Sequence, residues 1–183
     1  MDEYSKNVRR KDRQESDPRF FKKLLDESVS CSIAIERVGY PLNHVAFFVY
    51  DDKAHEIIFH FSKHGFAGEE ILDGKKVCIS VYKYGKLYTA TRAVDFGCEY
   101  QSLIIYGTIE ILQREEDRLR AMDLFFQKFF SGISKESYDG FTSQDAKPIH
   151  VARVKIEDWF GKEHLVPSFA LSSFYPASDP VII

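Results

Sequence analysis

Hydrophobic residues recur at every second position from Val29 to Ile35, with small or polar residues between them. This period of two is typical of a half-buried β-strand, whose side chains point alternately to the two faces of a sheet. Leu42 to Tyr50 is nearly all apolar and rich in β-formers, which predicts a strand covered on both faces. Glu56 to Phe61 follows across a short charged turn, so it is expected to pair with that strand as an antiparallel hairpin.

The alternating pattern stops between Ser62 and Asp73 and returns over Val77 to Val81, which predicts a crossover followed by a fourth strand. Ser102 to Leu112 is a long β-rich run interrupted by Gly107, where a bulge or a close backbone approach is expected. A last strand is predicted around Ala152 to Ile156.

Two segments have the period of a helix. Asp17 and Pro18 form a helix-start signal, and a short amphipathic helix follows before the first strand. Glu115 to Phe130 has apolar residues at helical spacing and an acidic first turn that complements the helix dipole. About six strands with short connections and one long helix predict a mainly β fold, an antiparallel six-stranded Greek-key-like barrel with flanking helices.

At 183 residues the chain is expected to form a single domain, 1–183. Residues 1–16 are interpreted as a polar N-terminal arm that includes the basic run Arg9 to Arg13, and residues 164–183 as an extended C-terminal tail. The sequence shows neither a secretory leader nor an apolar run long enough to span a membrane.

Composition narrows the choice of partners. A formal net charge of −3 gives no positive field for nucleic acid or for an anionic membrane, so neither partner is expected. Sixteen Phe and ten Tyr residues suit β-structure and flat ligands. The three cysteines include no C-x-x-C pair, which argues against a disulfide framework and a thiolate zinc site and favours the cytoplasm.

Signals for common kinds of chemistry are weak. His60 and His64 are four residues apart, but no H-E-x-x-H motif or neighbouring carboxylate supports them, so no metal site is expected. The sequence has neither a G-x-S-x-G nucleophile elbow nor a G-x-G-x-x-G dinucleotide fingerprint. What remains is the segment His60 to Gly65, where hydroxyl, ammonium, imidazole and freed backbone N–H groups could bind a phosphate.

Short segments in the same order along the chain resemble motifs of one family, the flavin-nucleotide-binding proteins related to pyridoxamine 5′-phosphate oxidase and to the nitroimidazole-resistance reductases. The segments are Val8–Arg13, Gly39–Pro41, Ile57–Ser62, Lys76–Val81, Glu99–Glu110 and Val154–Glu163. Each motif alone is loose, and their common order carries the resemblance.

The resemblance implies a split barrel in which FMN lies at the interface of a homodimer and meets a small-molecule substrate. The strand that would pass the flavin ring and bind it through its backbone comprises Asn43, His44, Val45, Ala46 and Phe47. The residues expected near the ribityl phosphate are His60, Phe61, Ser62, Lys63 and Gly65, and those expected from later strands are Tyr100, Gln101, Trp159 and Lys162. His60 is the expected catalytic proton donor.

The chain departs from the family pattern at three points. Phe66 and Ala67 stand where the family often has an Arg-Lys pair after the glycine, and the loss of two charge-assisted phosphate contacts would cost about 3 kcal/mol. Gln101 replaces the usual Arg, and Val45 stands where Pro is common.

Three functions follow from the resemblance. The first is an FMN-dependent oxidoreductase, of nitroreductase or pyridoxamine-phosphate-oxidase type, that reduces a small flat substrate. The second is a non-catalytic carrier of flavin or haem, and the third is a purely structural dimer module. The colour of the purified protein distinguishes them.

Overall fold

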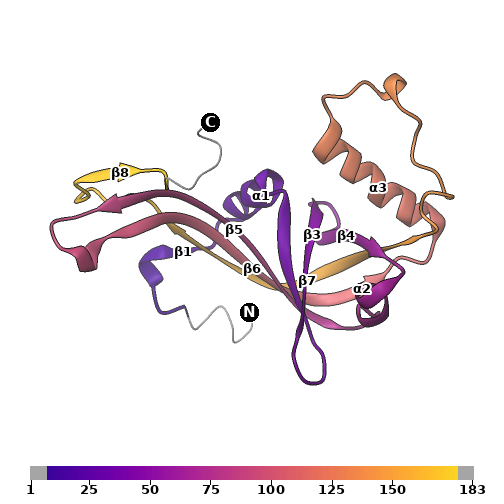
Figure 1. The fold of residues 1–183 in the computed structure, drawn as a ribbon, viewed down its shortest axis with the longest axis horizontal. Coiled ribbons are helices and arrows are strands. Elements are labelled where there is room, and N and C mark those ends of the chain that lie inside the picture. Colours follow the sequence, from indigo (N-terminus) through magenta and orange to yellow (C-terminus); the bar gives the residue numbers. More distant parts are fainter. Residues whose placement is uncertain (1–7, 177–183) are drawn as a thin grey trace.

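The computed structural model describes residues 8–176 and shows a barrel from which one long β-ribbon extends (Figure 1). In chain order the elements are η2 Lys11–Arg13, β1 Gln14–Glu15, α1 Pro18–Glu27, β2 Ser30–Ile35, β3 Leu42–Asp51, β4 Glu56–Ser62, α2 Gly65–Glu70, β5 Lys76–Thr89, η3 Ala93–Asp95, β6 Gly97–Ile111, α3 Glu115–Phe130, η4 Lys135–Ser137, β7 Ile149–His164 and β8 Ser172–Phe174. Residues 1–7 of the predicted arm and 177–183 of the predicted tail lie outside the described part.

Six antiparallel strands close the barrel. Their order is β7-β4-β3-β2-β5-β6, and β6 also pairs with β7. The strands β2, β3 and β4 form the predicted meander, and β5 returns to lie beside β2, which is the order of a Greek key. The mainly β fold and the six-stranded barrel are therefore confirmed.

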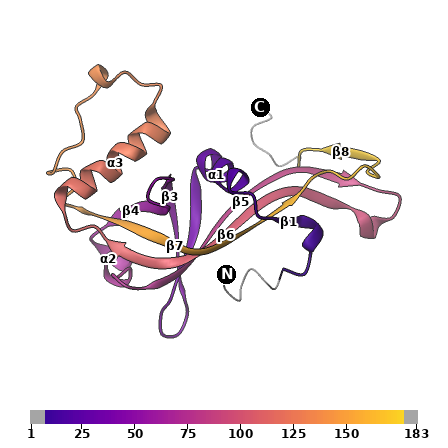
Figure 2. The same cartoon turned by 180° about the vertical axis from the view of Figure 1, so that it is seen from behind.

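The strands β5, β6 and β7 continue beyond the barrel. Residues 82–102, the far end of β5, the turn through η3 and the start of β6, form an extension that we call the ribbon (Figure 1, Figure 2). The segment Leu87 to Glu99 lacks clear alternation, and it forms the tip of this hairpin. The outer strands of the extension come from the predicted arm and tail, because β1 pairs with β7 and β8 pairs with β5.

The barrel interior contains the predicted inward side chains. Ile33, Ile79, Ile105 and Val154 are completely inaccessible to solvent. Helix α1 begins where Asp17 accepts a hydrogen bond from the N–H of Arg19 at 2.9 Å, and its buried face, Phe21, Leu24 and Leu25, packs against the same core. Val29, expected to be buried, precedes β2 and is 53% exposed, because the strand begins one residue later.

Helix α3 has the predicted bounds and covers part of the barrel's outside. Its residues Met122 and Phe125 pack with Val49, Ile58 and Val151 in a second cluster. This cover reaches only the second half of β3, so the prediction that β3 is covered on both faces is wrong for its first half, where Val45 and Phe47 are exposed. The physical reason is that α3 ends at Phe130, so it reaches Phe47 only through the ring of Phe129 and leaves Val45 uncovered.

Lys128 anchors the C-terminal end of α3. Its ammonium donates to the carbonyl oxygens of Leu25 at 2.9 Å and Phe48 at 3.0 Å, and it lies 4.1 Å from the centre of the Phe48 ring. Burial lowers the pKa of Lys128 to about 8. One side chain thus ties α3 to α1 and to β3.

None of the helices in residues 8–176 is long and apolar enough to cross a membrane.

Gly107 stands at the seam where β6 meets β7, and the predicted bulge is present as a register shift between Tyr106 and Gly107. A Cβ at this position would lie 2.2 Å from the carbonyl oxygen of Lys155. Because that oxygen belongs to the paired strand, it cannot withdraw without opening the seam.

We therefore expect Gly107→Ala to lower the free energy of unfolding by about 2 kcal/mol or more through overpacking. Urea unfolding followed by circular dichroism measures the loss. The control is Gly132→Ala, where nothing lies within 4 Å of the new Cβ. Equal stabilities of the two variants would contradict the close approach at the seam.

Candidate functional site

The cross-strand pairing places a row of side chains on the outside of the barrel. Val45 pairs with Ser32, Ser32 with Ser80, Ser80 with Ile104, and Ile104 with Phe160. Directly paired residues point to the same side of a sheet, so this row lies on one surface, opposite the inward Ile33 and Ile79. We call the surface of β3, β2, β5, β6 and β7 that carries this row the outer face.

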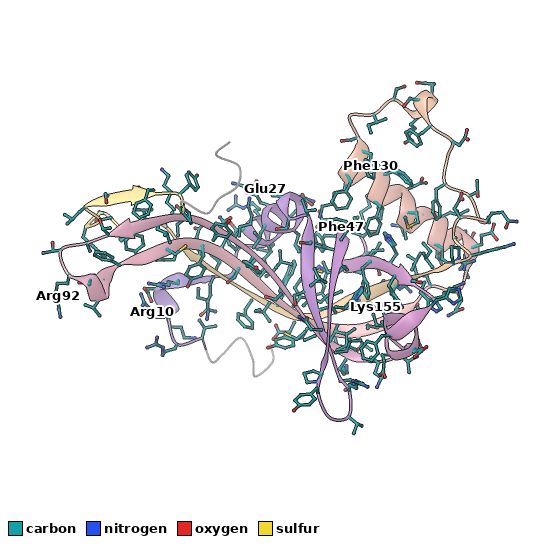
Figure 3. The ribbon with its side chains drawn as sticks, viewed as in Figure 1. Arg10, Glu27, Phe47, Arg92, Phe130 and Lys155 are labelled. Atoms are coloured by element: carbon teal, nitrogen blue, oxygen red, sulfur yellow. The ribbon has the colours of Figure 1, made fainter. Side chains whose placement is uncertain are left out.

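A groove crosses the outer face where α3 leaves it uncovered. The groove has a volume of about 410 Å³, and its lining includes Ser30, Ser32, Val45, Ser80, Tyr82 and Tyr84. Val45 and Tyr82 are 68% and 69% exposed, which is unusual for large side chains in the middle of strands. Phe47, labelled in Figure 3, pairs with the groove residue Ser30, and its ring centre lies 5.8 Å from that of Phe129 in α3. Flat apolar walls with several hydroxyls are suited to a planar polar ligand.

Strand β3 has an open edge beside this groove. Its pairing with β4 covers only Phe48 to Asp51, whereas β4 continues along β7 as far as Ser62. Over Leu42 to Phe47, β3 therefore has a strand partner on its β2 side only within the described residues. Backbone N–H and C=O groups along such an edge are free to bind a ligand.

The predicted strand residues divide between two environments. Asn43, Val45 and Phe47 point to the outer face, and the hydroxyl of Ser32 donates to the amide oxygen of Asn43 at 2.7 Å. His44 and Ala46 point into the barrel instead, as their burial and contacts show. The ring of His44 lies 6.3 Å from that of Phe59, and burial lowers the pKa of His44.

His60 lies on the outside of β4, beneath α3. Its ring meets the ring of Phe125 edge-on at 5.0 Å, and Nδ1 is inaccessible and has no hydrogen-bond partner among residues 8–176. Burial lowers the pKa of His60, so the imidazole is neutral at pH 7. Phe61, the next residue, points the other way, into the core against His150 at 5.4 Å.

The loop after β4 is held in place by its backbone. The hydroxyl of Ser62 accepts from the N–H of His64 at 3.1 Å, and the N–H of Lys63 donates to the carbonyl of Pro148 at 2.9 Å. Gly65 has a φ of +78°, which favours glycine at this turn. Helix α2 packs so closely on the loop that a Cβ at Gly68 would lie 2.2 Å from the carbonyl oxygen of Lys63.

A guanidinium reaches this loop from another part of the chain. Arg37, in the turn between β2 and β3, lies 5.1 Å from the centre of the Phe66 ring and forms an ion pair with Glu70 at 3.0 Å. Sequence reasoning did not identify Arg37, because its position depends on how the turn folds back on α2.

The later strands contribute unequally. Tyr100 pairs with Tyr84 and His164, and Lys162 pairs with Ser102, so Tyr100 and Lys162 belong to the outer face. Gln101 and Trp159 point to the opposite side of the sheet. The amide of Gln101 donates to Glu163 at 2.7 Å, and Trp159 packs on Phe21 and His55 with ring centres 4.7 and 4.6 Å away.

Sequence reasoning also missed Ser30, Ser80, Tyr82 and Tyr84. The signal was present, because these residues occupy the polar positions of the same alternation that predicted the buried residues.

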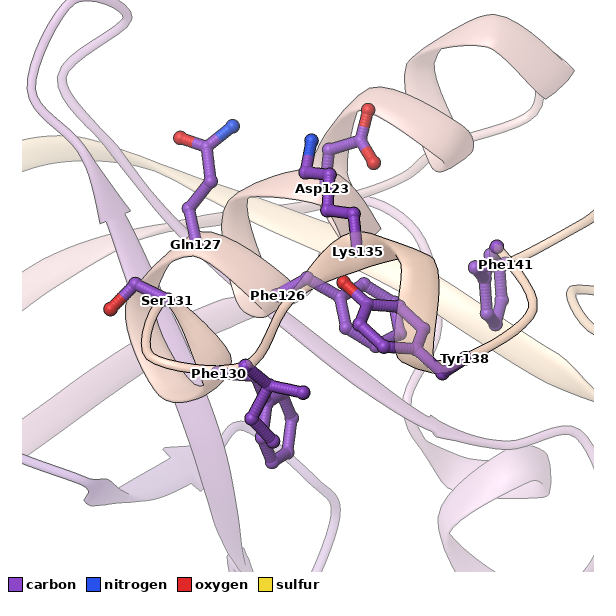
Figure 4. A pocket seen from close by; sticks show the side chains of 10 residues that line it. Asp123, Phe126, Gln127, Phe130, Ser131, Lys135, Tyr138 and Phe141 are labelled. Atoms are coloured by element: carbon purple, nitrogen blue, oxygen red, sulfur yellow. The ribbon is translucent and has the colours of Figure 1, made fainter.

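A second pocket of about 390 Å³ lies between α3 and the following loop, where the rings of Phe126 and Tyr138 stack with their centres 5.9 Å apart (Figure 4). It contains none of the predicted site residues. Residues 8–176 hold no cluster of three or more His, Cys, Asp or Glu side chains suited to a metal.

The sequence model of one family, pyridoxamine 5′-phosphate oxidase, matches residues 18–163. The chain belongs to this family. The match spans the whole barrel, from α1 nearly to the end of β7. A search of curated proteins finds no match to the chain.

Solved structures share the fold. The flavocytochrome Anf3 from Azotobacter vinelandii has a TM-score of 0.80 at 19% identity, covering 93% of this chain and 77% of that one. A FAD and haem binding protein from Mycobacterium smegmatis has a TM-score of 0.76 at 18% identity, covering 84% and 74%. A protein assigned to 5-nitroimidazole antibiotic resistance in Bacteroides thetaiotaomicron has a TM-score of 0.63 at 15% identity, covering 81% and 85%.

The depressed pKa of His60 predicts a pH effect on stability. A histidine whose pKa is lower in the folded state stabilises the fold above its ordinary pKa of 6.5, and this contribution is lost as the pH falls below that value. His60→Gln, which does not titrate, should therefore lose less stability than the wild type between pH 7 and pH 5. Urea unfolding at several pH values measures the difference. Parallel profiles for His60→Gln and the wild type would contradict the burial of His60.

Proposed function

We propose that this chain binds FMN and acts, as a homodimer, as an oxidoreductase on a small flat substrate. The observation that carries the proposal is the groove on the outer face beside the open edge of β3, in a chain of the pyridoxamine 5′-phosphate oxidase family. The proposal places the protein in the cytoplasm, where its three cysteines stay reduced.

The groove fits the ring of a flavin. Val45 and Tyr82 offer apolar surface to its faces, and the backbone of residues 42–47 offers donors and acceptors to its polar edge. Ser32 holds the side chain of Asn43 in one orientation, which limits the rearrangement needed on binding.

The loop after β4 fits the phosphate end. It supplies the Lys63 ammonium, the Ser62 hydroxyl and the turn at Gly65, with Arg37 close by on the Phe66 ring. Arg37 is already paired with Glu70, so its charge is partly used, and we propose that it replaces only part of the Arg-Lys pair seen in the family.

The related structures support a flavin but leave its form open. The Mycobacterium smegmatis protein binds FAD together with haem, and a second related structure is a FAD-binding protein from Mesorhizobium loti. We propose FMN for this chain because the loop after β4 offers groups for a single terminal phosphate.

Bound flavin would supply the electron-transfer chemistry, and the protein would supply position and proton control. His60 is the residue proposed for the proton, since its Nδ1 is unpaired within the described part and the ring is kept neutral by burial. Helix α3 shields it from water through Phe125.

A non-catalytic carrier of flavin or haem is the second candidate. Phe66 and Ala67 reduce the positive charge at the phosphate end, and one related structure is a flavocytochrome. Absorbance separates a haem carrier from a flavin-binding protein, because a flavoprotein is yellow and a haem protein is red.

Titration with FMN, followed by quenching of flavin fluorescence, tests the proposal. We expect saturable binding of FMN, weaker binding of riboflavin, which lacks the phosphate, and a yellow complex. FAD serves as the third ligand, and a preference for FAD would overturn the choice of FMN. Absence of binding to any flavin would overturn the whole proposal.

The double variant Phe66→Arg/Ala67→Lys sharpens this test. Restoring two charged donors should tighten FMN binding by up to about a hundredfold, as two charge-assisted hydrogen bonds would. Riboflavin affinity should not change. Equal gains for both ligands would place the phosphate elsewhere.

The homodimer is proposed from the same outer face. Val45, Phe47, Tyr82 and Tyr84 together leave an exposed apolar surface that a second copy could cover. Tyr82→Glu should then shift sedimentation from dimer to monomer, because burying an unpaired carboxylate opposes association. Tyr40→Glu, at a turn residue that is 88% exposed, should remain dimeric. A monomeric wild type would overturn this part.

A further inference from the structure

The outer face continues onto the ribbon, where an arginine from the N-terminal segment reaches it. Tyr84, Tyr100 and His164 form a cross-strand row there. Arg13, in η2, lies against this row, with Nη1 3.4 Å from the Tyr100 hydroxyl and the guanidinium carbon 5.9 Å from the ring centre. Residues 11–15, which form η2 and β1, lie on the opposite side of the ribbon from α1 (Figure 1, Figure 3).

Among the described residues, a carboxylate that interacts electrostatically with Arg13 is that of Asp12. The neighbouring Arg10 donates two hydrogen bonds, of 2.8 and 2.6 Å, to Asp12. Both oxygens of that carboxylate therefore already have a partner. Within residues 8–176, Arg13 forms no ion pair, and its inaccessible Nε has no hydrogen-bond partner. A guanidinium with an unused donor beneath the surface is an incomplete arrangement that an anion would complete.

Two further polar side chains lie at the same place and are hydrogen-bonded to each other. The Tyr88 hydroxyl lies 2.7 Å from Nε2 of His164, and the ring of His164 lies 6.0 Å from that of Tyr100. Burial lowers the pKa of His164, and the positive charges of Arg13 and Arg10 lower it further. Of the nearby acids, Asp12 is paired with Arg10, and Glu99 accepts from the N–H of Lys86.

We propose that Arg13, Tyr100 and His164 form a phosphate-binding subsite for a small phosphorylated molecule. Arginine suits a phosphate because its planar fork donates two parallel hydrogen bonds, and the Tyr100 hydroxyl adds a third donor. On β6 the row of Tyr100 is four residues from the row of Ile104, which is about 13 Å at the usual rise of a strand. The subsite therefore borders the groove and is distinct from the loop after β4.

Calorimetric titration of the full chain, free of flavin, with pyrophosphate and with ADP tests the subsite. We expect saturable binding of both probes, and Arg13→Gln should raise their dissociation constants at least about tenfold, the loss expected for a charged donor pair. Tyr100→Phe removes one hydroxyl, keeps the ring, and should weaken binding by a smaller factor.

Arg19→Gln is the matched control. Arg19 lies on α1, away from the Tyr100 row, and its guanidinium is paired with Asp17 at 2.7 Å, so its replacement should leave both dissociation constants unchanged. No binding of either probe to the wild type, or equal loss in Arg13→Gln and Arg19→Gln, would overturn the subsite. Circular dichroism of each variant confirms that the fold is retained.

Repeating the titration after loading with FMN separates two sources of phosphate. If the loaded protein still binds ADP, the subsite serves a second phosphorylated ligand, such as a substrate or an electron donor. If FMN displaces pyrophosphate, and Arg13→Gln weakens FMN but not riboflavin, the subsite holds the flavin's own phosphate. Both results support phosphate binding at Arg13. Because the first titration needs no flavin, its outcome is independent of the flavin proposal.

Discussion

The pairing of β7 with two strands at once is the constraint on which the rest of the molecule depends. Along one edge β7 follows β4 from Lys155 to Ile149, and along the other it follows β6 as far as Tyr100. This double pairing closes the barrel, and it also draws β4 away from β3 after Phe59. The open edge of β3, the groove beside it and the placement of the loop at Ser62 are all consequences of the same choice of partner.

Helix α3 connects the stability of the barrel with the groove. Phe125 covers His60, Phe129 contacts Phe47, and Lys128 binds carbonyl oxygens of α1 and β3. A movement of α3 would therefore change the cover of His60 and the border of the groove together. The cost of keeping Lys128 charged in this position is reflected in its lowered pKa.

Local patterns predicted much of the fold. The alternation in β2 and β5 gave the inward residues, and the helical period with its acidic first turn gave both ends of α3. The ribbon was not predicted, because Tyr88 and Gly97 at its tip face each other across strands and leave no periodic signal. The half-covered state of β3 was not predictable either, since it depends on where α3 ends in space.

The candidate site was predictable in its location but not in its orientation. Resemblance identified the strand around Val45, the loop at Ser62 and the strand at Tyr100. It could not tell that Tyr100 and Gln101 point to opposite sides, which is decided by register with β5 and β7. The basic run that contains Arg13 was noted as able to contact phosphate but was interpreted as a solvated arm, and Arg37 was not identified, since it reaches the loop through a turn whose course no short pattern describes.

The unpaired stretch of β3 has a consequence for the protein before it meets any ligand. An exposed strand edge accepts another strand as readily as it accepts a small molecule, and the adjoining residues Val45 and Phe47 are apolar. Newly made chains held without cofactor or partner would add to one another through this edge. The soluble fraction of the protein in the cell would then depend on how much cofactor or partner is available to cover this edge.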